Sequence, residues 1–554
     1  MKKFDIRILR TLALAPAVLL FTSCRSSDTD QTLSTGPAAV SFNLAGTDYA
    51  QDNSNGPNPT ASTEKTSVNT NNSDDSRTAL ITPSYVVVTE YVPASKNQKS
   101  YAQASAGISP VAAVSGNTLN SGNKFRVIAY RSGDGSYHTY QDYTIGQPGQ
   151  PMMLDAGVPY NIIVYSYGTT TLPNISSGEQ SNINSAVVNY DNTNRDFMYQ
   201  NISVTPAYTE NGQTNTLSIT LRHKTTQVTP IITTSPTGIS TISNAVFTPH
   251  FSDGTIPLAT GSVTGRITST NQPLTFPGPF PATTQTGNTV LVNADTGGNA
   301  TGSFTADITI GGITKTVAFN NAFKVTPEST GNLNINLIKC GAYTAPGVFT
   351  EFMCFNLGTN TNINPFTPSA AIHGAKYQWG AQTGETGRYV SQEEDQSNSG
   401  AIAGWNNTNT AQNTWLDAIK TSKDPCPSGY RVPTSVQWQG VINNNPITRI
   451  GTPWSDSPTN YNSLIKIGNN LALPIAGVRD ISVGGLQVRG RIGYYWSSTN
   501  ANVSQSKILF ITGTNYTISN AASASGYSVR CIADPTQTTW NSTDSTSIDV
   551  QFNK

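Results

Sequence analysis

The sequence has few charged residues and no net charge. Lys, Arg, Asp and Glu make up only 12% of its 554 residues, and 32 basic side chains balance 32 acidic ones. Nucleic-acid-binding proteins carry a surplus of basic residues, so the composition excludes that class of partner. The abundance of Asn, Thr, Ser and Gly is more typical of extracellular β-proteins than of cytosolic enzymes. A chain of this length can form three domains, each with its own core.

Histidines are also few, and recognisable catalytic motifs are missing. The chain has no Cys-x-x-Cys, His-Glu-x-x-His, Gly-x-Ser-x-Gly or phosphate-loop motif. Its four histidines lack the spacing of metal ligands: His138, His223, His250 and His373. We expect His223, between two basic residues, and the acidic run 393–395 to be solvated. The sequence therefore predicts no metal, no cofactor and no catalytic residue, and a protein that is not an enzyme.

The N-terminus combines basic residues with a short apolar run. Four basic residues lie among the first ten, followed by apolar residues 12–21 and then by Cys24. The run is too short to span a bilayer as a stable helix, and it predicts a secretory signal over residues 1–23. The segment resembles a bacterial lipoprotein signal, with Phe21 where Leu is usual. This resemblance implies that Cys24 carries the lipid and anchors the protein to a membrane. The alternative is a plain signal peptide with an incidental cysteine.

Without Cys24 the chain has four cysteines, all in its C-terminal third. An even number of cysteines in an exported chain indicates disulfides, and three pairings are possible. We favour Cys340 with Cys354 and Cys426 with Cys531. The second bridge would close a loop of about 105 residues and contribute on the order of 4 to 5 kcal/mol.

Short β-prone runs fill the first two thirds of the chain. Residues 24–37 are polar and predict a flexible tether. The alternation of residues 40–44 predicts a half-buried strand. The polar residues that follow, through Arg77, predict a long exposed loop. Further strands are expected at 85–89, 125–130, 160–167, 202–204, 217–221, 228–232, 245–251 and 263–267.

The clearest hairpin of the sequence lies at residues 304–319. Two alternating runs flank Gly311 and Gly312, and glycine readily adopts the positive φ angles of a two-residue turn. Strands at this spacing indicate two antiparallel β-sandwiches, over residues 38–204 and 205–339. The predicted fold is therefore mainly β.

The two predicted sandwiches resemble the fimbrillin superfamily, the subunits of Bacteroidetes pili, which have transthyretin-like sandwiches. Val40-Ser-Phe-Asn-Leu44 and the runs 160–167 and 217–224 carry the likeness. It implies export as a lipoprotein and a cut after an arginine that removes the first strand. A neighbouring subunit then fills the groove with its own strand. Arg77 is the candidate cut site, and the alternative is an ordinary arginine in a loop.

The C-terminal third contains four specific motifs. They are Asp424-Pro-Cys-Pro-Ser-Gly-Tyr-Arg-Val-Pro-Thr434, Ala472-Leu-Pro-Ile-Ala-Gly-Val-Arg479, Gly493-Tyr-Tyr-Trp-Ser-Ser-Thr499 and Ser528-Val-Arg-Cys531. Thr434 is expected to cap a helix that carries Trp438. Residues 340–535 thereby resemble the Fibrobacter succinogenes major paralogous domain, which implies a disulfide-bonded α+β domain of the C-type lectin-like fold. Gln437 departs from the glutamate that is usual there, which weakens any acid role at that position.

The chemistry of related folds does not transfer to this domain. The calcium-binding motifs of sugar-binding C-type lectins are missing, and the cysteines are placed as structural residues, unlike the reactive thiols of formylglycine-generating enzymes. Most tryptophans are expected in the core, including Trp438 and Trp496. Trp405 and Trp454 lie among loop residues and are the candidate ligand-binding side chains.

These features predict a cell-surface adhesion protein of the outer membrane, anchored by lipid and then assembled into a fimbria as a tip or accessory subunit. Its predicted partners are other pilus subunits, bound by strand exchange, and a glycan or surface protein. The tail 536–554 contains an alternating run at 547–552, which could pair within the protein or be donated. The alternatives are a stationary glycan-binding lipoprotein and, third, a surface enzyme acting on glycans.

Overall fold

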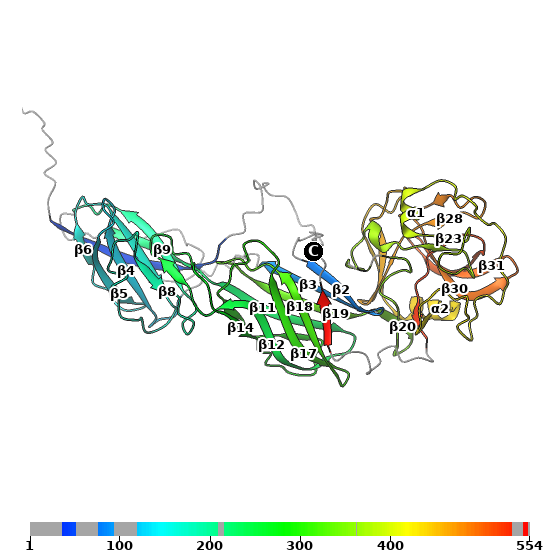
Figure 1. Ribbon diagram of the computed structural model, residues 1–554, viewed down its shortest axis with the longest axis horizontal. Coiled ribbons are helices and arrows are strands. Elements are labelled where there is room, and N and C mark those ends of the chain that lie inside the picture. The colour runs from blue at the N-terminus through cyan, green and yellow to red at the C-terminus, as the bar shows by residue number, and fades with distance from the viewer. Residues whose placement is uncertain are drawn as a thin grey trace, which may run out of the picture.

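The structure, a computed structural model, describes residues 36–50, 76–93, 119–208, 215–359, 361, 363–534 and 547–551. Within these residues the protein is mainly β. Three bodies follow one another along the long axis of the molecule, and the C-terminal body lies at one end (Figure 1). None of the helices in these ranges is both long and apolar enough for a membrane span. The predicted signal peptide and Cys24 lie outside the described residues.

A seven-stranded sheet forms the first body. Side chains from all seven strands meet in one cluster on one face, among them Val40, Val127 and Leu221. Because neighbouring residues of a strand point to opposite faces, Ile128 and Ile163 join a second cluster on the other face. In spatial order the strands are β5 (Tyr137–Thr144), β4 (Lys124–Arg131), β7 (Tyr160–Ser166), β9 (Met198–Val204), β10 (Asn215–His223), β1 (Pro37–Asp48) and β6 (Met152–Asp155).

The second face of this sheet is covered by chain from a later segment. Strand β13 (Thr255–Pro257) pairs with β8 (Val187–Asn189) in antiparallel register. It brings Ile256 and Leu258 into the second cluster. The first body therefore includes residues that lie well beyond its predicted end at 204.

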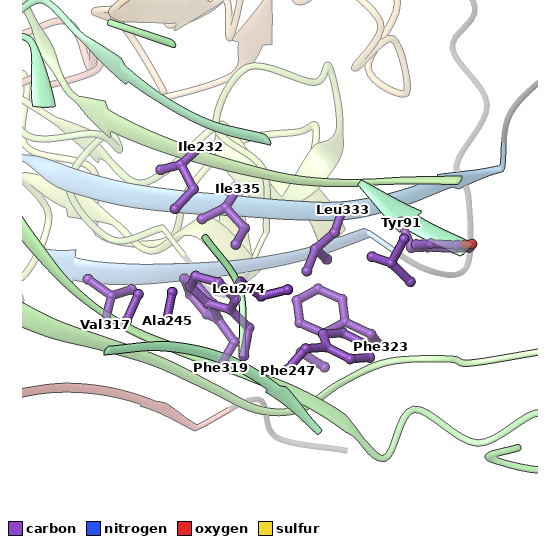
Figure 2. Packing of buried hydrophobic residues seen from close by; sticks show 14 of the residues in the cluster. Tyr91, Ile232, Ala245, Phe247, Leu274, Val317, Phe319, Phe323, Leu333 and Ile335 are labelled. Atoms are coloured by element: carbon purple, nitrogen blue, oxygen red, sulfur yellow. The ribbon is translucent and has the colours of Figure 1, made fainter. Parts of the chain in front are cut away.

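The second body is a sandwich of two sheets. Leu333 and Ile335 of one sheet face Phe247 and Phe319 of the other across a shared core (Figure 2). One sheet contains β15 (Thr284–Thr286), β11 (Thr226–Ser235), β19 (Thr330–Lys339), β3 (Tyr85–Pro93) and β2 (Ser76–Thr82), with β16 (Val290–Val292) also on β11. The other contains β14 (Ser269–Pro273), β12 (Ile239–Phe251), β17 (Gly302–Ile310), β18 (Ile313–Phe323) and β34 (Ser547–Gln551).

The predicted Gly-Gly hairpin is confirmed. Ile310 of β17 pairs with Ile313 of β18 across Gly311 and Gly312, whose φ angles are 60° and 80°. A side chain at these positive angles would be strained, so the glycines fix the turn and with it the register of β17 and β18. The expected strand at 263–267, by contrast, is wrong. It forms only an isolated bridge at Thr264, and Ile267 is 83% exposed.

The expected border near residue 205 is also wrong. Strand β10 belongs to the first sheet, whereas β2 and β3 cross into the second body before the chain returns to build β4. Both bodies also contain a parallel pair, β1 with β10 and β11 with β19, so they are not purely antiparallel. Local alternation identifies strands, but it does not identify the partner of a strand that is distant in sequence.

The C-terminal body combines short sheets with two helices. Two clusters form its core, one around Trp438 and one around Trp496. Its elements are β20 (Gly341–Ala345), β21 (Val348–Glu351), η2 (Ala370–Ile372), β22 (Lys376–Tyr377), β23 (Tyr389–Val390), α1 (Gln392–Ser397), β24 (Tyr430–Arg431), α2 (Ser435–Asn444), β25 (Ile447–Ile450), β26 (Leu464–Ile467), β27 (Leu471–Pro474), β28 (Val478–Arg479), β29 (Leu486–Gln487), β30 (Gly493–Asn502), β31 (Gln505–Ile511), β32 (Tyr516–Ala522) and β33 (Ile532–Ala533).

Candidate functional site

Strand β1 lies inside the first sheet although it comes from the N-terminal end of the described chain. It pairs in parallel with β10 and in antiparallel with β6, so Val40 lies between Asn215 and Met152. The Val40 side chain is fully buried, and Phe42 and Leu44 pack against the same cluster. Removing β1 would therefore expose two strand edges and a row of apolar side chains. This gap between β6 and β10 is called the β1 slot below.

The C-terminal end of β1 is held by charged and aromatic contacts. Arg222 of β10 donates two hydrogen bonds to the Asp48 carboxylate, at 2.6 and 3.0 Å. The Tyr49 ring stacks on the His223 ring at 4.1 Å, and the Ala50 amide donates to the Glu328 carbonyl at 2.8 Å. These contacts join β1 to the second body as well as to its own sheet.

His223 is not the solvated residue that we expected. Its side chain is nearly buried, and its Nδ1 lies 2.5 Å from an Asp196 carboxylate oxygen. The expectation failed because the basic neighbours, Arg222 and Lys224, each have an acidic partner of their own in the fold, Asp48 and Glu328. Tyr49 supplies the apolar cover.

Arg77 lies in strand β2, whereas the sequence predicted a loop. Strand β2 is the edge strand of its sheet and pairs with β3, with Arg77 opposite Thr89. The Thr89 hydroxyl donates to the Arg77 carbonyl at 3.4 Å. The prediction was wrong because the polar residues before Arg77 outweigh the short apolar run 79–81 in the local composition. An edge strand presents one side of its main chain to other chains. The predicted loop itself, residues 51–75, lies outside the described residues.

The C-terminal tail contains the strand that its alternation predicted. Strand β34 adds in parallel to β18 at the edge of its sheet, with Ile548 opposite Val317. It also contacts β2, the edge strand of the facing sheet, and Figure 1 shows the two strands at the same side of the second body. The strand that carries Arg77 and the strand from the tail are therefore neighbours.

The C-terminal body is mounted on the second body by specific contacts. The β2–β3 turn reaches into it: the Ser84 hydroxyl donates to Glu351 at 2.6 Å and accepts from Tyr430 at 2.9 Å. The Asn470 side-chain amide donates to the carbonyls of Ser235 and Lys339. Buried apolar residues from both bodies form a cluster around these polar contacts. The position of the C-terminal body is therefore set by packing and hydrogen bonds, in addition to the connecting chain.

The motif 424–434 builds the turn and the helix cap that the sequence predicted. The Thr434 hydroxyl accepts the Gln437 amide at 3.1 Å, and Gln437 Oε1 accepts the Thr434 amide at 2.8 Å. Gln437 thus completes a capping box, for which an amide serves as well as a carboxylate. The disulfides join Cys340 to Cys354 and Cys426 to Cys531, the pairing favoured from the sequence.

The tryptophans divide as expected between core and loops. Trp438 and Trp496 are fully buried, and Trp379 and Trp415 are buried with them. Trp405 and Trp454 are half-buried. They lie against different parts of the domain, and each donates its ring N–H to a loop carbonyl, Trp405 to Ile481 at 3.2 Å and Trp454 to Gly451 at 3.1 Å.

The surroundings of Trp405 make it the better candidate for ligand binding. Its ring rests on the backbone of Gly484, where a Cβ atom would come within 2.7 Å of the ring. The neighbouring loop side chains Ile481 and Val483 are 43% and 50% exposed. Trp454 instead packs against the core around Trp438, with the Arg449 guanidinium 5.8 Å from its ring. The half-buried Trp405 and the exposed side chains of Ile481 and Val483 are together called the Trp405 loop patch below.

Sequence reasoning missed the role of Asp395. It is fully buried in helix α1 and binds Arg479 and Arg489, whereas a solvated acidic loop was expected. The available signal was Arg479 itself, because a cation at the end of the apolar run 472–478 needs a buried acceptor. Among the described residues, no group of three or more His, Cys, Asp or Glu could hold a metal ion.

No protein-family model and no curated protein matches the chain by sequence. Solved structures similar to it include a cell adhesion candidate from Parabacteroides distasonis, at 13% identity and a TM-score of 0.29, covering 46% of this chain and 89% of that one. A fimbrial assembly protein from the same species has 9% identity and a TM-score of 0.26, covering 39% and 86%. The fimbrial anchor protein Mfa2 from Porphyromonas gingivalis has 14% identity and a TM-score of 0.24, covering 34% and 71%.

Proposed function

We propose that the protein is a surface adhesion protein that assembles by strand exchange, as the tip or an accessory subunit of a fimbria. In this proposal it is exported as a lipoprotein through Cys24, and a cut after Arg77 releases β1 together with the anchor. A strand from a neighbouring subunit then fills the β1 slot.

The position of β1 is the observation that carries the proposal. A strand with apolar side chains on one face lies between β6 and β10, yet it reaches the rest of the chain only through residues 51–75. A cut at Arg77 would leave no covalent link to it. Main-chain donors and acceptors on both neighbouring strands would then need a new partner, and strand addition supplies one.

The incoming strand must meet a defined geometry. It has to run parallel to β10 and antiparallel to β6, and every second residue must be apolar to replace Val40 and its neighbours. A flat or polar strand would leave the buried cluster open to water. The tail segment 547–552, with apolar residues at alternate positions, meets the sequence requirement.

The C-terminal body is proposed to bind a glycan or a surface protein through the Trp405 loop patch. Flat aromatic rings stack on sugar faces and also anchor protein interfaces. The rigid mount on the second body would present this patch at one end of the subunit, as a tip requires. The alternative is a stationary glycan-binding lipoprotein, which would use the same patch without the cut.

Replacing Arg77 tests the proposal in cells. Arg77→Gln should leave the lipid-anchored form in the outer membrane and remove the protein from sheared filaments. Arg491→Gln is the matched control, because Arg491 is an exposed arginine of the C-terminal body, and it should assemble as the wild type does. Normal assembly of the Arg77→Gln protein would refute the proposal.

A further inference from the structure

Five polar side chains lie at the centre of the C-terminal body without solvent contact. Lys376 comes from β22, Asp395 from α1 and Arg479 from β28, while Arg489 and His373 come from loops. Their exposures are 0% or 1%. These residues are called the buried charge cluster below. It is separate from the β1 slot and from the Trp405 loop patch.

The Asp395 carboxylate forms ion pairs with three cations in this cluster. Arg479 Nε donates to Asp395 Oδ1 at 2.8 Å, and Arg489 Nη2 donates to Asp395 Oδ2 at 2.6 Å. The other terminal N–H groups of Arg479 and Arg489 reach backbone carbonyls or, for Arg489, the Tyr461 hydroxyl. Burying charge is costly unless it is compensated, and here positive charge is in excess.

Several donors of the cluster have no hydrogen-bond partner among the described residues. The Lys376 ammonium lies 3.5 Å from Asp395 Oδ2, at the outer limit of a hydrogen bond. It has no other acceptor, Arg489 Nε has none either, and neither ring nitrogen of His373 has a hydrogen-bond partner. Native proteins rarely leave buried polar atoms in this state.

The unpartnered donors belong to neighbouring side chains. Lys376 and Arg489 approach the same carboxylate oxygen, Asp395 Oδ2. The His373 ring packs edge-on against Tyr461 with centroids 5.0 Å apart, and the Arg489 guanidinium lies 5.0 Å from the same Tyr461 ring. Lys376 and Arg489 therefore meet at Asp395, and Arg489 and His373 pack against the same Tyr461 ring.

Near neutral pH, the protonation states of these side chains leave the buried charge cluster with excess positive charge. Burial lowers the pKa of Lys376 to about 8, although Asp395 opposes this, so the ammonium is still charged. Burial and the charges of Lys376 and Arg489 lower the pKa of His373, which leaves the imidazole neutral. Burial alone would raise the pKa of Asp395, but the three cations outweigh it and lower that pKa.

We propose that the buried charge cluster binds one small monovalent anion, a halide such as chloride, between Lys376, Arg489 and His373. A halide accepts hydrogen bonds from all sides, and its negative charge offsets part of the excess positive charge of Lys376, Arg479 and Arg489 around the single Asp395 carboxylate. A water molecule accepts fewer hydrogen bonds than a halide and would leave the charge uncompensated. The proposal names a small ion because every member of the cluster is buried. The ion would stabilise the C-terminal body.

Urea unfolding of the full-length chain tests this proposal. Six of the seven tryptophans lie between residues 379 and 496, so tryptophan fluorescence follows the C-terminal body. Chloride is varied from about 1 mM to about 500 mM against gluconate at constant ionic strength and neutral pH, which separates binding from screening. Above the dissociation constant, the unfolding equilibrium constant should fall about tenfold for each tenfold rise in chloride.

Lys376→Met removes the ammonium while keeping an unbranched side chain of similar length. It should abolish the chloride dependence and, in gluconate, be at least as stable as the wild type, because a buried cation is gone. Lys423→Met is the matched control, since Lys423 is an exposed lysine of the same body, and it should keep the dependence. Equal chloride dependence in both variants, or none in the wild type, would overturn the proposal.

Crystals of the wild-type chain grown in bromide give a direct readout that does not depend on whether the variant folds. An anomalous peak within hydrogen-bond reach of the Lys376 ammonium and Arg489 Nε is expected. A bromide-free cluster, with a water molecule or protein atoms as the partner of Lys376, would contradict the proposal.

Discussion

A peptide that contains β1 should bind to a chain that lacks it. The chain is produced from Thr78 onward, and residues 36–50 are supplied as a separate labelled peptide. Because β6 and β10 then offer unpaired main-chain groups beside a row of apolar side chains, the peptide should dock in the register that β1 adopts, with Val40 between Asn215 and Met152.

The burial of Val40 determines how strongly a substitution at this position should weaken binding of the peptide. Its side chain is 0% exposed in the cluster that all seven strands share. Val40→Ala removes two methyl groups and leaves a small cavity, which should cost about 2 kcal/mol and weaken binding roughly 30-fold. Asn43→Ala is the control on the same strand, because Asn43 is exposed, and it should change affinity by less than about twofold.

Fluorescence anisotropy of the labelled peptide measures both affinities. Far-ultraviolet circular dichroism, which follows the β-sheets of the whole chain, shows whether the chain from Thr78 is folded. The reasoning fails if the folded chain does not bind the peptide, or if the Val40→Ala and wild-type peptides bind equally well. In either case the apolar row of β1 would not be what holds the strand in its slot.

Three further predictions concern stability. His250 is fully buried, accepts the Asn293 amide and lies 2.8 Å from the Asn192 side chain. Burial and the charge of Arg195 lower its pKa to about 4. As the pH falls, the His250 imidazole is protonated in the unfolded chain before it is protonated in the folded chain. The free energy of unfolding should therefore fall by on the order of 3 kcal/mol as pH drops from about 6.5 to about 4. His250→Gln should remove that loss in calorimetry of the second body. Replacing Cys426 and Cys531 with alanine, which opens a loop of 105 residues, should destabilise the C-terminal body by about 5 kcal/mol in urea unfolding. Gly440→Ala should lower the free energy of unfolding by about 1 to 3 kcal/mol, although alanine favours helices. The reason is that the Cβ of the new alanine would lie 1.9 Å from the Thr344 carbonyl oxygen.

Each of these predictions has a control in the same chain. His138→Gln should leave the pH dependence of the second body unchanged, because His138 lies in the first body, on β5. The bridge between Cys340 and Cys354 spans only 14 residues, so its loss should cost less, about 3 kcal/mol. A Gly440→Ala protein more stable than the wild type would show that α2 can move away from β20.

Local patterns predicted the strands of this protein better than their partners. The alternation in residues 40–44 and the Gly-Gly pair at 311–312 identified β1 and the β17–β18 hairpin, because both signals depend on adjacent residues. The parallel pairing of β1 with β10 joins segments about 175 residues apart, and no local pattern encodes it. The crossing of β2 and β3 into the second body was missed for the same reason.

The candidate site was predictable where a motif fixed it. The helix cap at Thr434 and the burial of Trp438 and Trp496 followed from the C-terminal motifs. The buried charge cluster could not be predicted, because Asp395 and its arginine partners are separated by more than 80 residues and meet only in the folded domain. The strand around Arg77 was missed because its polar neighbours dominate the composition.

The most direct test of the central claim is the identity of the N-terminal residue, and the lipid content, of the protein recovered from sheared surface filaments. The strand-exchange account predicts a lipid-free chain that begins at Thr78 in the filament fraction. Recovery of the protein only from the outer membrane, with a lipid on Cys24, would contradict it and favour the stationary glycan-binding lipoprotein.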